Sequence, residues 1–169
     1  PLVLDADALN LIAQQSALRT ALLFRTAPTL LTPHPAEAAR LLGTSTAAVQ
    51  ADRVAAALKL ADAHRCAIVL KGAGSVCAFS DGRWAINTSG NPGMAAAGMG
   101  DVLTGILAAL LAQRVEAQTA LESGVYLHGA AADALVEAGT GPVGLTASEV
   151  IDAARDLVNR REGMMMNNE

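Results

Sequence analysis

The chain has 169 residues, of which 52% are hydrophobic and 2% aromatic, and its formal net charge is −4. A chain with so few aromatic residues and no basic cluster has little with which to bind nucleic acid. It shows no apolar run of membrane-spanning length without polar interruption and no signal-peptide pattern, so we expect a cytoplasmic protein that does not bind membranes. Cys66 and Cys77 lie in apolar runs and are expected to be buried free thiols.

Short apolar runs alternate with helical spacing over the first seventy residues. Strands are predicted at residues 1–5, 29–32 and 66–71, and helices at 8–23, 36–42 and 46–62. Gly43 would close the second of these helices, and Thr46 would cap the third. His64 would lie at a solvated helix end.

A hairpin and three further helices follow in the second half. The hairpin joins residues 76–79 and 83–86 through Ser80-Asp81-Gly82, and the helices are predicted at 101–113, 116–138 and 147–159. This order is typical of a layered α/β domain with a mostly parallel sheet. We expect one domain over residues 1–160 and a disordered tail at 161–169.

The first predicted strand has a consequence for the sheet. It is of the buried type, and three parallel strands alone would leave one apolar edge without a partner. We therefore expect further strands, from the same domain or from another chain, to complete the sheet.

Residues 87–101, here called the glycine loop, run directly into an apolar helix and contain one charged residue, Asp101. Amide groups at a helix start have no intrahelical acceptor and attract anions. Gly98 and Gly100 would let the backbone approach a phosphate closely because they have no Cβ. The spacing matches neither a Walker A loop nor a dinucleotide fingerprint. The structural alternative is an ordinary glycine turn in which Asp101 caps the helix.

Polar residues also follow the three predicted parallel strands. Asp5, Asp7, His34 and Lys71 fall at the carboxyl ends of these strands, where α/β sheets bind ligands. Each has an ordinary structural interpretation as well: Asp7 could cap a helix, and His34 could be a local hydrogen-bonding residue. His128 is expected to pack in the core or at an interface.

Five motifs occur in a fixed order along the chain. They are Leu4-Asp-Ala-Asp-Ala-Leu-Asn10, Leu31-Thr-Pro-His-Pro-Ala-Glu37, Leu70-Lys-Gly-Ala-Gly-Ser75, Asn91-Pro-Gly-Met-Ala95 and Gly98-Met-Gly-Asp-Val-Leu103. The series resembles the carboxyl-terminal part of the ADP/ATP-dependent NAD(P)H-hydrate dehydratases, members of the ribokinase-like superfamily. The resemblance extends to about residue 158 and implies a three-layer α/β/α domain whose amino-terminal strands are missing here.

The resemblance implies a metabolite-repair lyase. Such an enzyme returns the S epimer of NADH or NADPH hydrate to NADH or NADPH and converts ADP, or ATP in eukaryotes, into a shorter nucleotide and phosphate. The co-substrate would carry Mg²⁺, and the domain would work with, or be fused to, a hydrate epimerase. The alanine-rich helical surface would suit a homo-oligomer.

The resemblance also implies a role for individual residues. Asp101 would be the general base that deprotonates the hydrate hydroxyl. The implied anion hole is Gly98, Met99 and Gly100. The implied nucleotide-binding residues are Lys71, Gly72, Ala73, Gly74, Ser75 and Gly100. The implied substrate-binding residues are His34, Asn91 and Asp101. Glu37 could reach a hydrated Mg²⁺ or merely complement the helix dipole.

Two alternatives remain open at this point. A small-molecule kinase of the same superfamily would use the same loop and base but release a phosphorylated product. A non-catalytic fragment would bind nucleotide, or only assemble with a partner. The residues do not distinguish ADP from ATP, or NADH hydrate from NADPH hydrate.

Overall fold

The computed structural model describes residues 1–165 of the chain, and the side chains of residues 1–159. Five strands form one sheet in sequence order: β1 (Leu2–Leu4), β2 (Thr29–Leu31), β3 (Ala67–Leu70), β4 (Val76–Ala78) and β5 (Trp84–Ile86). The first three strands are parallel, whereas β4 and β5 return antiparallel. The sheet is therefore mixed, with the predicted hairpin at one edge.

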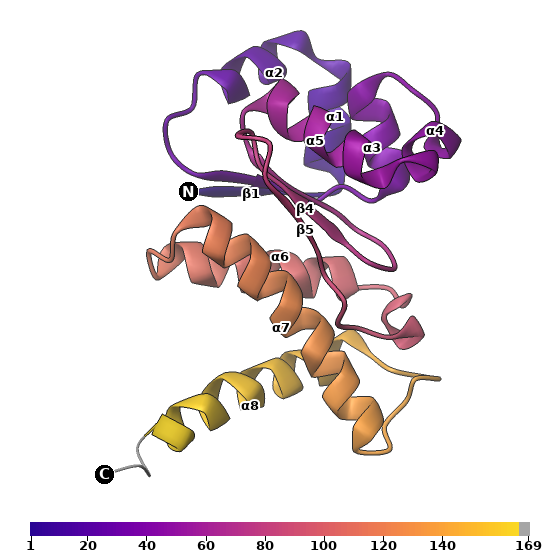
Figure 1. Cartoon of the computed structure of the whole chain (residues 1–169), viewed down its shortest axis with the longest axis vertical. Coiled ribbons are helices and arrows are strands. Elements are labelled where there is room, and N and C mark those ends of the chain that lie inside the picture. Colours follow the sequence, from indigo (N-terminus) through magenta and orange to yellow (C-terminus); the bar gives the residue numbers. More distant parts are fainter. Residues whose placement is uncertain (166–169) are drawn as a thin grey trace.

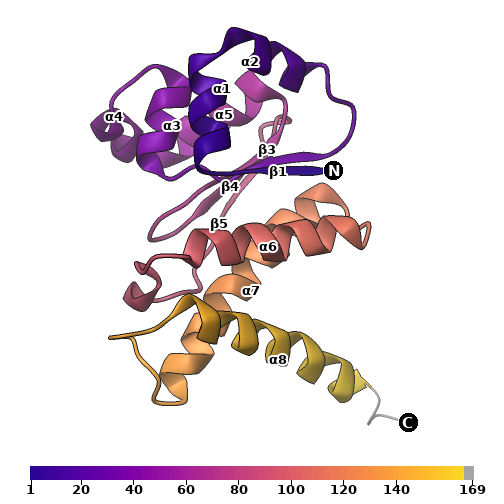
Figure 2. The same cartoon turned by 180° about the vertical axis from the view of Figure 1, so that it is seen from behind.

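Helices cover both faces of this sheet. One side carries α1 (Asp7–Gln14), α2 (Ser16–Leu23), α3 (Pro35–Leu42), α4 (Thr46–Ala51) and α5 (Arg53–His64). The other side carries α6 (Met99–Ala112) and α7 (Ala117–Glu137), and α8 (Ala147–Met165) packs on these two away from the sheet. Figures 1 and 2 show the resulting α/β/α layers, which confirm the predicted fold class. None of the helices described is long and apolar enough to cross a bilayer.

Of the parallel strands, β2 and nearly all of β3 are buried on both faces, and β1 is partly buried, because successive side chains point to opposite sides. Leu31 packs in the cluster under α1, α3 and α5, whereas its neighbour Leu30 packs under α6 and α7. A third cluster, which includes Met99 and Val150, joins α6, α7 and α8. Burial of these apolar faces is the main favourable contribution to folding.

Two helices predicted as continuous are each divided in two. The first breaks at Gln15, whose extended backbone lets α1 pack on α3 while α2 turns toward α5. The second breaks at Asp52, whose side chain accepts from Ala55 N at 2.9 Å and so caps α5. The first part of this predicted helix, α4, is capped by Ser45 and not by Thr46. Helical spacing alone missed both breaks because a cap inside the pattern leaves the spacing intact.

The prediction for His64 was wrong, and those for the two cysteines were confirmed. His64 is buried, and its Nδ1 lies 3.0 Å from Leu60 O, because this side of α5 faces the sheet. Burial lowers the pKa of the His64 ring. Cys66 and Cys77 are free and buried, and burial raises the pKa of each thiol to about 12.

The two ends of the predicted domain compare differently with the structure. β1 pairs with β2, and among the described residues no strand pairs with its other edge. At the far end, α8 runs through Met165, beyond the predicted boundary at residue 160. Residues 166–169 of the expected tail lie outside the described residues.

Candidate active site at the carboxyl ends of the parallel strands

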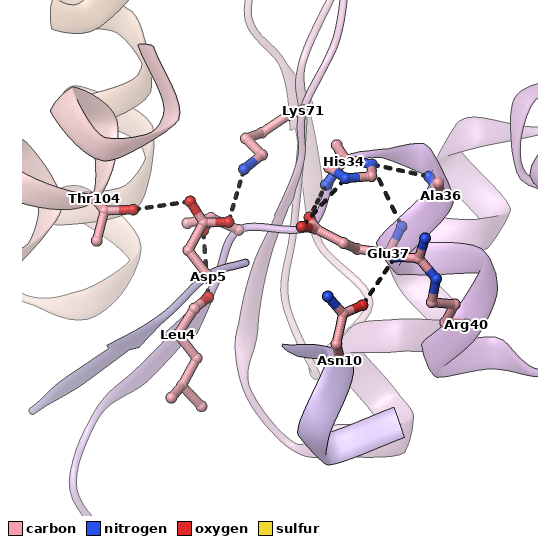
Figure 3. Close-up of polar contacts among 10 residues, drawn as sticks. Leu4, Asp5, Asn10, His34, Ala36, Glu37, Arg40, Lys71 and Thr104 are labelled. Atoms are coloured by element: carbon pink, nitrogen blue, oxygen red, sulfur yellow. Dashed lines mark hydrogen bonds and ion pairs between the residues drawn. The ribbon is translucent and has the colours of Figure 1, made fainter. Parts of the chain in front are cut away.

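Asp5, which follows β1, joins three elements at the ends of the parallel strands. Its Oδ1 accepts from Lys71 Nζ at 2.7 Å, and its Oδ2 accepts from Thr104 Oγ1 of α6 at 3.2 Å (Figure 3). Both members of the ion pair are largely buried, with side-chain exposures of 21% for Lys71 and 13% for Asp5. Asp5 therefore fixes the Lys71 ammonium between the sheet and α6.

The first turn of α6 lies against this ion pair. A Cβ built on Gly100 would stand 3.4 Å from both Asp5 Oδ2 and Lys71 Nζ. The N-cap residue is Gly98, with a left-handed φ of 85°, and no side chain caps the helix. The amides of Met99, Gly100 and Asp101 find no acceptor among the described residues. The unpaired amides at the start of α6 thus lie next to the Lys71 ammonium, and both attract anions.

Asp101 is the third residue of α6 and does not cap it, so the capping alternative is wrong. Its side chain is exposed and has no hydrogen bond or ion pair with the residues that the structure describes. A carboxylate that is exposed and unpaired beside an anion-attracting helix start is available to a ligand. Its fold-stabilising role is limited to its charge near the helix dipole.

His34 forms a capping box with Glu37 at the start of α3. His34 Nδ1 accepts from Ala36 N at 3.1 Å, and Glu37 Oε2 accepts from His34 N at 2.8 Å. Because Nδ1 accepts, the neutral ring carries its proton on Nε2, which lies 3.2 Å from Glu37 Oε1. The ring is held in place yet remains 47% exposed. We call Asp5, His34, Glu37 and Lys71 the strand-end cluster.

The contacts of Glu37 bear on the expected Mg²⁺. Both carboxylate oxygens face His34, and the residue is buried. Within the described part of the chain, no group of three or more His, Cys, Asp or Glu side chains could hold a metal ion. The described residues therefore hold no ready-made site of three protein ligands, and the contacts of Glu37 are those of a capping box with His34.

The Lys71–Ser75 segment forms a tight turn after β3. Its two ends are joined because Ser75 Oγ donates to Gly72 O at 3.0 Å and accepts from Gly72 N at 3.2 Å. Lys71 N donates to Pro33 O at 2.9 Å, which places this turn beside the His34 loop. Arg53 of α5 contacts the turn from behind.

Asp133 of α7 anchors the glycine loop. Its Oδ2 accepts from Gly90 N at 2.7 Å, and its Oδ1 accepts from Asn91 Nδ2 at 3.0 Å. Asn91 Oδ1 accepts in turn from Gly93 N at 3.1 Å, at the start of the short 3₁₀ helix Pro92–Met94. The Asn91 side chain therefore holds the loop together.

His128 is buried on α7, as predicted, and its Nε2 has no hydrogen-bond partner among the described residues. Burial, followed by the positive charge of Lys71, lowers the pKa of His128 to about 4. The buried imidazole is therefore neutral at physiological pH, and the Lys71 ammonium lies near enough to disfavour its protonation.

Asp5 and Asp7, which were expected together at the carboxyl ends of the strands, are separated in the structure. Asp5 joins Lys71, whereas Asp7 and Asn10 line a surface pocket with Arg40, whose Nη1 donates to Asn10 Oδ1 at 2.9 Å. The division arises because α1 begins at Asp7 and turns the chain away from the strand end.

Sequence reasoning gave no positioning role to three residues that position the site: Thr104, Arg53 and Asp133. Thr104 follows Asp101 by three residues on the same helix, so helical spacing could have found it. Arg53 and Asp133 act on segments 17 to 43 residues away in the chain. No local pattern indicates such contacts.

Comparisons with known proteins identify the family. A model of the NAD(P)H-hydrate dehydratase family matches residues 1–155. An ADP-dependent (S)-NAD(P)H-hydrate dehydratase of Neisseria meningitidis is 50% identical over 161 residues, covering 95% of this chain and 54% of that protein. A bifunctional NAD(P)H-hydrate repair enzyme of Escherichia coli is 43% identical over 159 residues, covering 94% of this chain and 29% of that protein. The chain spans about half the length, or less, of these relatives.

Solved structures share the fold. An ADP/ATP-dependent NAD(P)H-hydrate dehydratase from Bacillus subtilis, co-crystallized with ATP/Mg²⁺ and soaked with CoA, matches with a TM-score of 0.79 and 33% identity over 95% of this chain and 56% of that one. A ribokinase-like superfamily protein from Enterococcus faecalis matches with a TM-score of 0.72 and 29% identity over 95% and 52%. The chain therefore belongs to the NAD(P)H-hydrate dehydratase family.

Proposed function

We propose that this chain carries the phosphoryl-transfer half of a nucleotide-dependent NAD(P)H-hydrate dehydratase. The observation that supports it most directly is the meeting of Lys71 Nζ with the uncapped start of α6, 3.4 Å from the Cβ position of Gly100. This place combines an ammonium with free amides, which stabilise the charge of a transferring phosphoryl group. Gly98, Met99 and Gly100 form the anion hole, and the Lys71–Ser75 turn binds the adenine nucleotide.

Asp101 is the general base of the proposed reaction. It stands in the first turn of the helix that would bind the phosphoryl group, and its carboxylate is exposed. His34 and Asn91 are assigned to the hydrate side. For His34, the support is a ring that the capping box orients while it remains exposed. Asn91 would contribute by holding the glycine loop in shape.

The reaction balances with ADP as the only co-reactant. Asp101 accepts the hydroxyl proton as the hydrate oxygen bonds to the β-phosphorus, and the bond from that phosphorus to the bridging oxygen breaks to release AMP. The phosphorylated hydrate then loses phosphate with the electrons of its C–O bond, and a ring proton leaves as the double bond re-forms. The products are NAD(P)H, AMP and phosphate.

The setting of the enzyme is part of the proposal. ADP is favoured over ATP because the Neisseria relative is named for ADP dependence. Mg²⁺ would arrive with the nucleotide phosphates. Relatives named as bifunctional repair enzymes support work with an epimerase. A cytoplasmic location and a homo-oligomeric state complete the proposal.

The test is to incubate the protein with ADP and NADPH hydrate and follow the near-ultraviolet absorbance of the reduced nicotinamide. We expect the absorbance to recover while AMP and phosphate appear in equal amounts. A stable phosphorylated product would support the kinase alternative. Binding of ADP without turnover would support the non-catalytic alternative, and either result would overturn the proposal.

A further inference from the structure

One backbone carbonyl of the Lys71–Ser75 turn and that of the residue before it accept hydrogen bonds from the same guanidinium, that of Arg53. Arg53, the first residue of α5, donates from Nη2 to Leu70 O and from Nη1 to Ala73 O, both at 3.0 Å. These carbonyls lie immediately before the turn and near its end. A planar fork that binds both at once fixes their separation and their direction.

The direction of the Ala73 carbonyl determines the direction of the next amide. In a planar trans peptide the C=O and the following N–H point in opposite directions. Because Ala73 O faces Arg53, the Gly74 N–H faces away from it. The amides of Ala73 and Gly74 have no acceptor in the part of the chain that the structure describes. Adjacent free amides in a turn form a concave site that attracts anions.

The guanidinium also explains why the turn needs glycine. A Cβ on Gly72 would lie 2.7 Å from Arg53 Nη1 and 2.9 Å from Nη2, so the fork rests directly on the glycine Cα. Its φ of 149° also disfavours other residues. Arg53 Nε is buried without a partner, a cost that the two carbonyl bonds must offset. The arrangement fits a residue retained for the shape of the turn.

We propose that Arg53 is a positioning residue for the nucleotide phosphates. It acts through the Ala73–Gly74 peptide, whose amide it directs toward a phosphate oxygen, and it does not itself need to touch the ligand. This inference rests on the proposed function, since it assigns the phosphates of the adenine nucleotide to the Lys71–Ser75 turn.

The test compares ADP with adenosine, which lacks the phosphates. Arg53→Lys keeps the charge but loses the fork, and Arg65→Lys makes the same change at the exposed end of α5. We expect Arg53→Lys to weaken ADP binding about tenfold in calorimetry, as for one charge-assisted hydrogen bond, and to leave adenosine binding unchanged. Arg65→Lys should change neither.

Other outcomes separate the two proposals. If Arg53→Lys weakens ADP and adenosine equally, or neither, the inference fails while the proposed function stands. If the unsubstituted protein binds no ADP, the proposed function fails and the inference falls with it. If the variant does not fold, amide NMR of the unsubstituted protein decides: ADP but not adenosine should shift the Gly74 resonance, and an unmoved resonance would overturn the inference.

Discussion

The strand-end cluster and the glycine loop contribute different groups to one candidate site: paired side chains in the first, and backbone amides in the second. In the strand-end cluster, side chains pair with one another, as Lys71, which follows β3, does with Asp5, which follows β1, at 2.7 Å. In the glycine loop the backbone itself is the presented surface, and Asp133 holds it from α7. Figure 3 shows Thr104 reaching Asp5; Thr104 lies on α6, the helix into which the glycine loop runs, so this contact links that helix to the strand-end cluster.

This difference predicts whether a substitution in each region should affect folding or ligand binding. Charges in the strand-end cluster are compensated, so removing one partner leaves the other buried and unpaired. In the proposed reaction the glycine loop acts through free amides and one free carboxylate, so a change there should affect ligand binding more than folding. The following predictions test this contrast.

The largest effect is expected for Asp101→Asn. Turnover should fall by about 10²- to 10⁴-fold, the usual contribution of a general base, while the melting temperature changes little because the side chain has no partner among the described residues. Steady-state kinetics and thermal unfolding measure both. Asp62→Asn, an exposed carboxylate of α5, is the matched control. A variant that keeps more than about a tenth of the rate would refute the role of base.

The next effect concerns how the free energy of unfolding depends on pH through His128. The His128 ring titrates near pH 4 in the folded chain, against an ordinary value of 6.5. Because the unfolded chain binds the proton first as pH falls, unfolding free energy should drop by about 3 kcal/mol between pH 7 and pH 4. Urea unfolding across this range measures it.

His128→Phe should remove most of this dependence on pH. The control is Val125→Ala, which is buried on the same helix and should lower stability equally at every pH. A variant that retains the full slope would show that His128, kept neutral mainly by its burial, is not the group whose protonation destabilises the fold. Part of any remaining slope is expected from His64, whose pKa burial also lowers.

The smallest effect is expected where the two regions meet. Gly100→Val should weaken ADP binding at least about tenfold, because its side chain would fill the space beside Asp5 and Lys71 where an anion would approach the α6 amides. The fold should survive, since the first Cβ contacts are at an ordinary 3.4 Å. Gly105→Ala on the same helix meets nothing within 4 Å and should leave binding intact. Calorimetry with unchanged ADP affinity in Gly100→Val would contradict the anion hole.

Much of the fold could be predicted because its signals are local. Short apolar runs indicated the five strands, Gly43 marked the end of α3 correctly, and the Ser80-Asp81-Gly82 turn marked the hairpin of β4 and β5. The two split helices could not be predicted, because Gln15 and Asp52 interrupt the backbone without disturbing the apolar spacing. His64 was misplaced for a related reason: spacing near a helix end does not say which side faces the sheet.

The sequence by itself determined the family, the alternation of strands and helices, and the residue types of the site, because ordered motifs and periodicity are properties of the chain. Only the tertiary structure decided the partners. It paired Lys71 with Asp5 across 66 residues, turned Glu37 into a cap for His34, and brought Arg53 under the Lys71–Ser75 turn. Such contacts depend on strand order and helix packing, which place side chains by distance in space and not by distance along the chain.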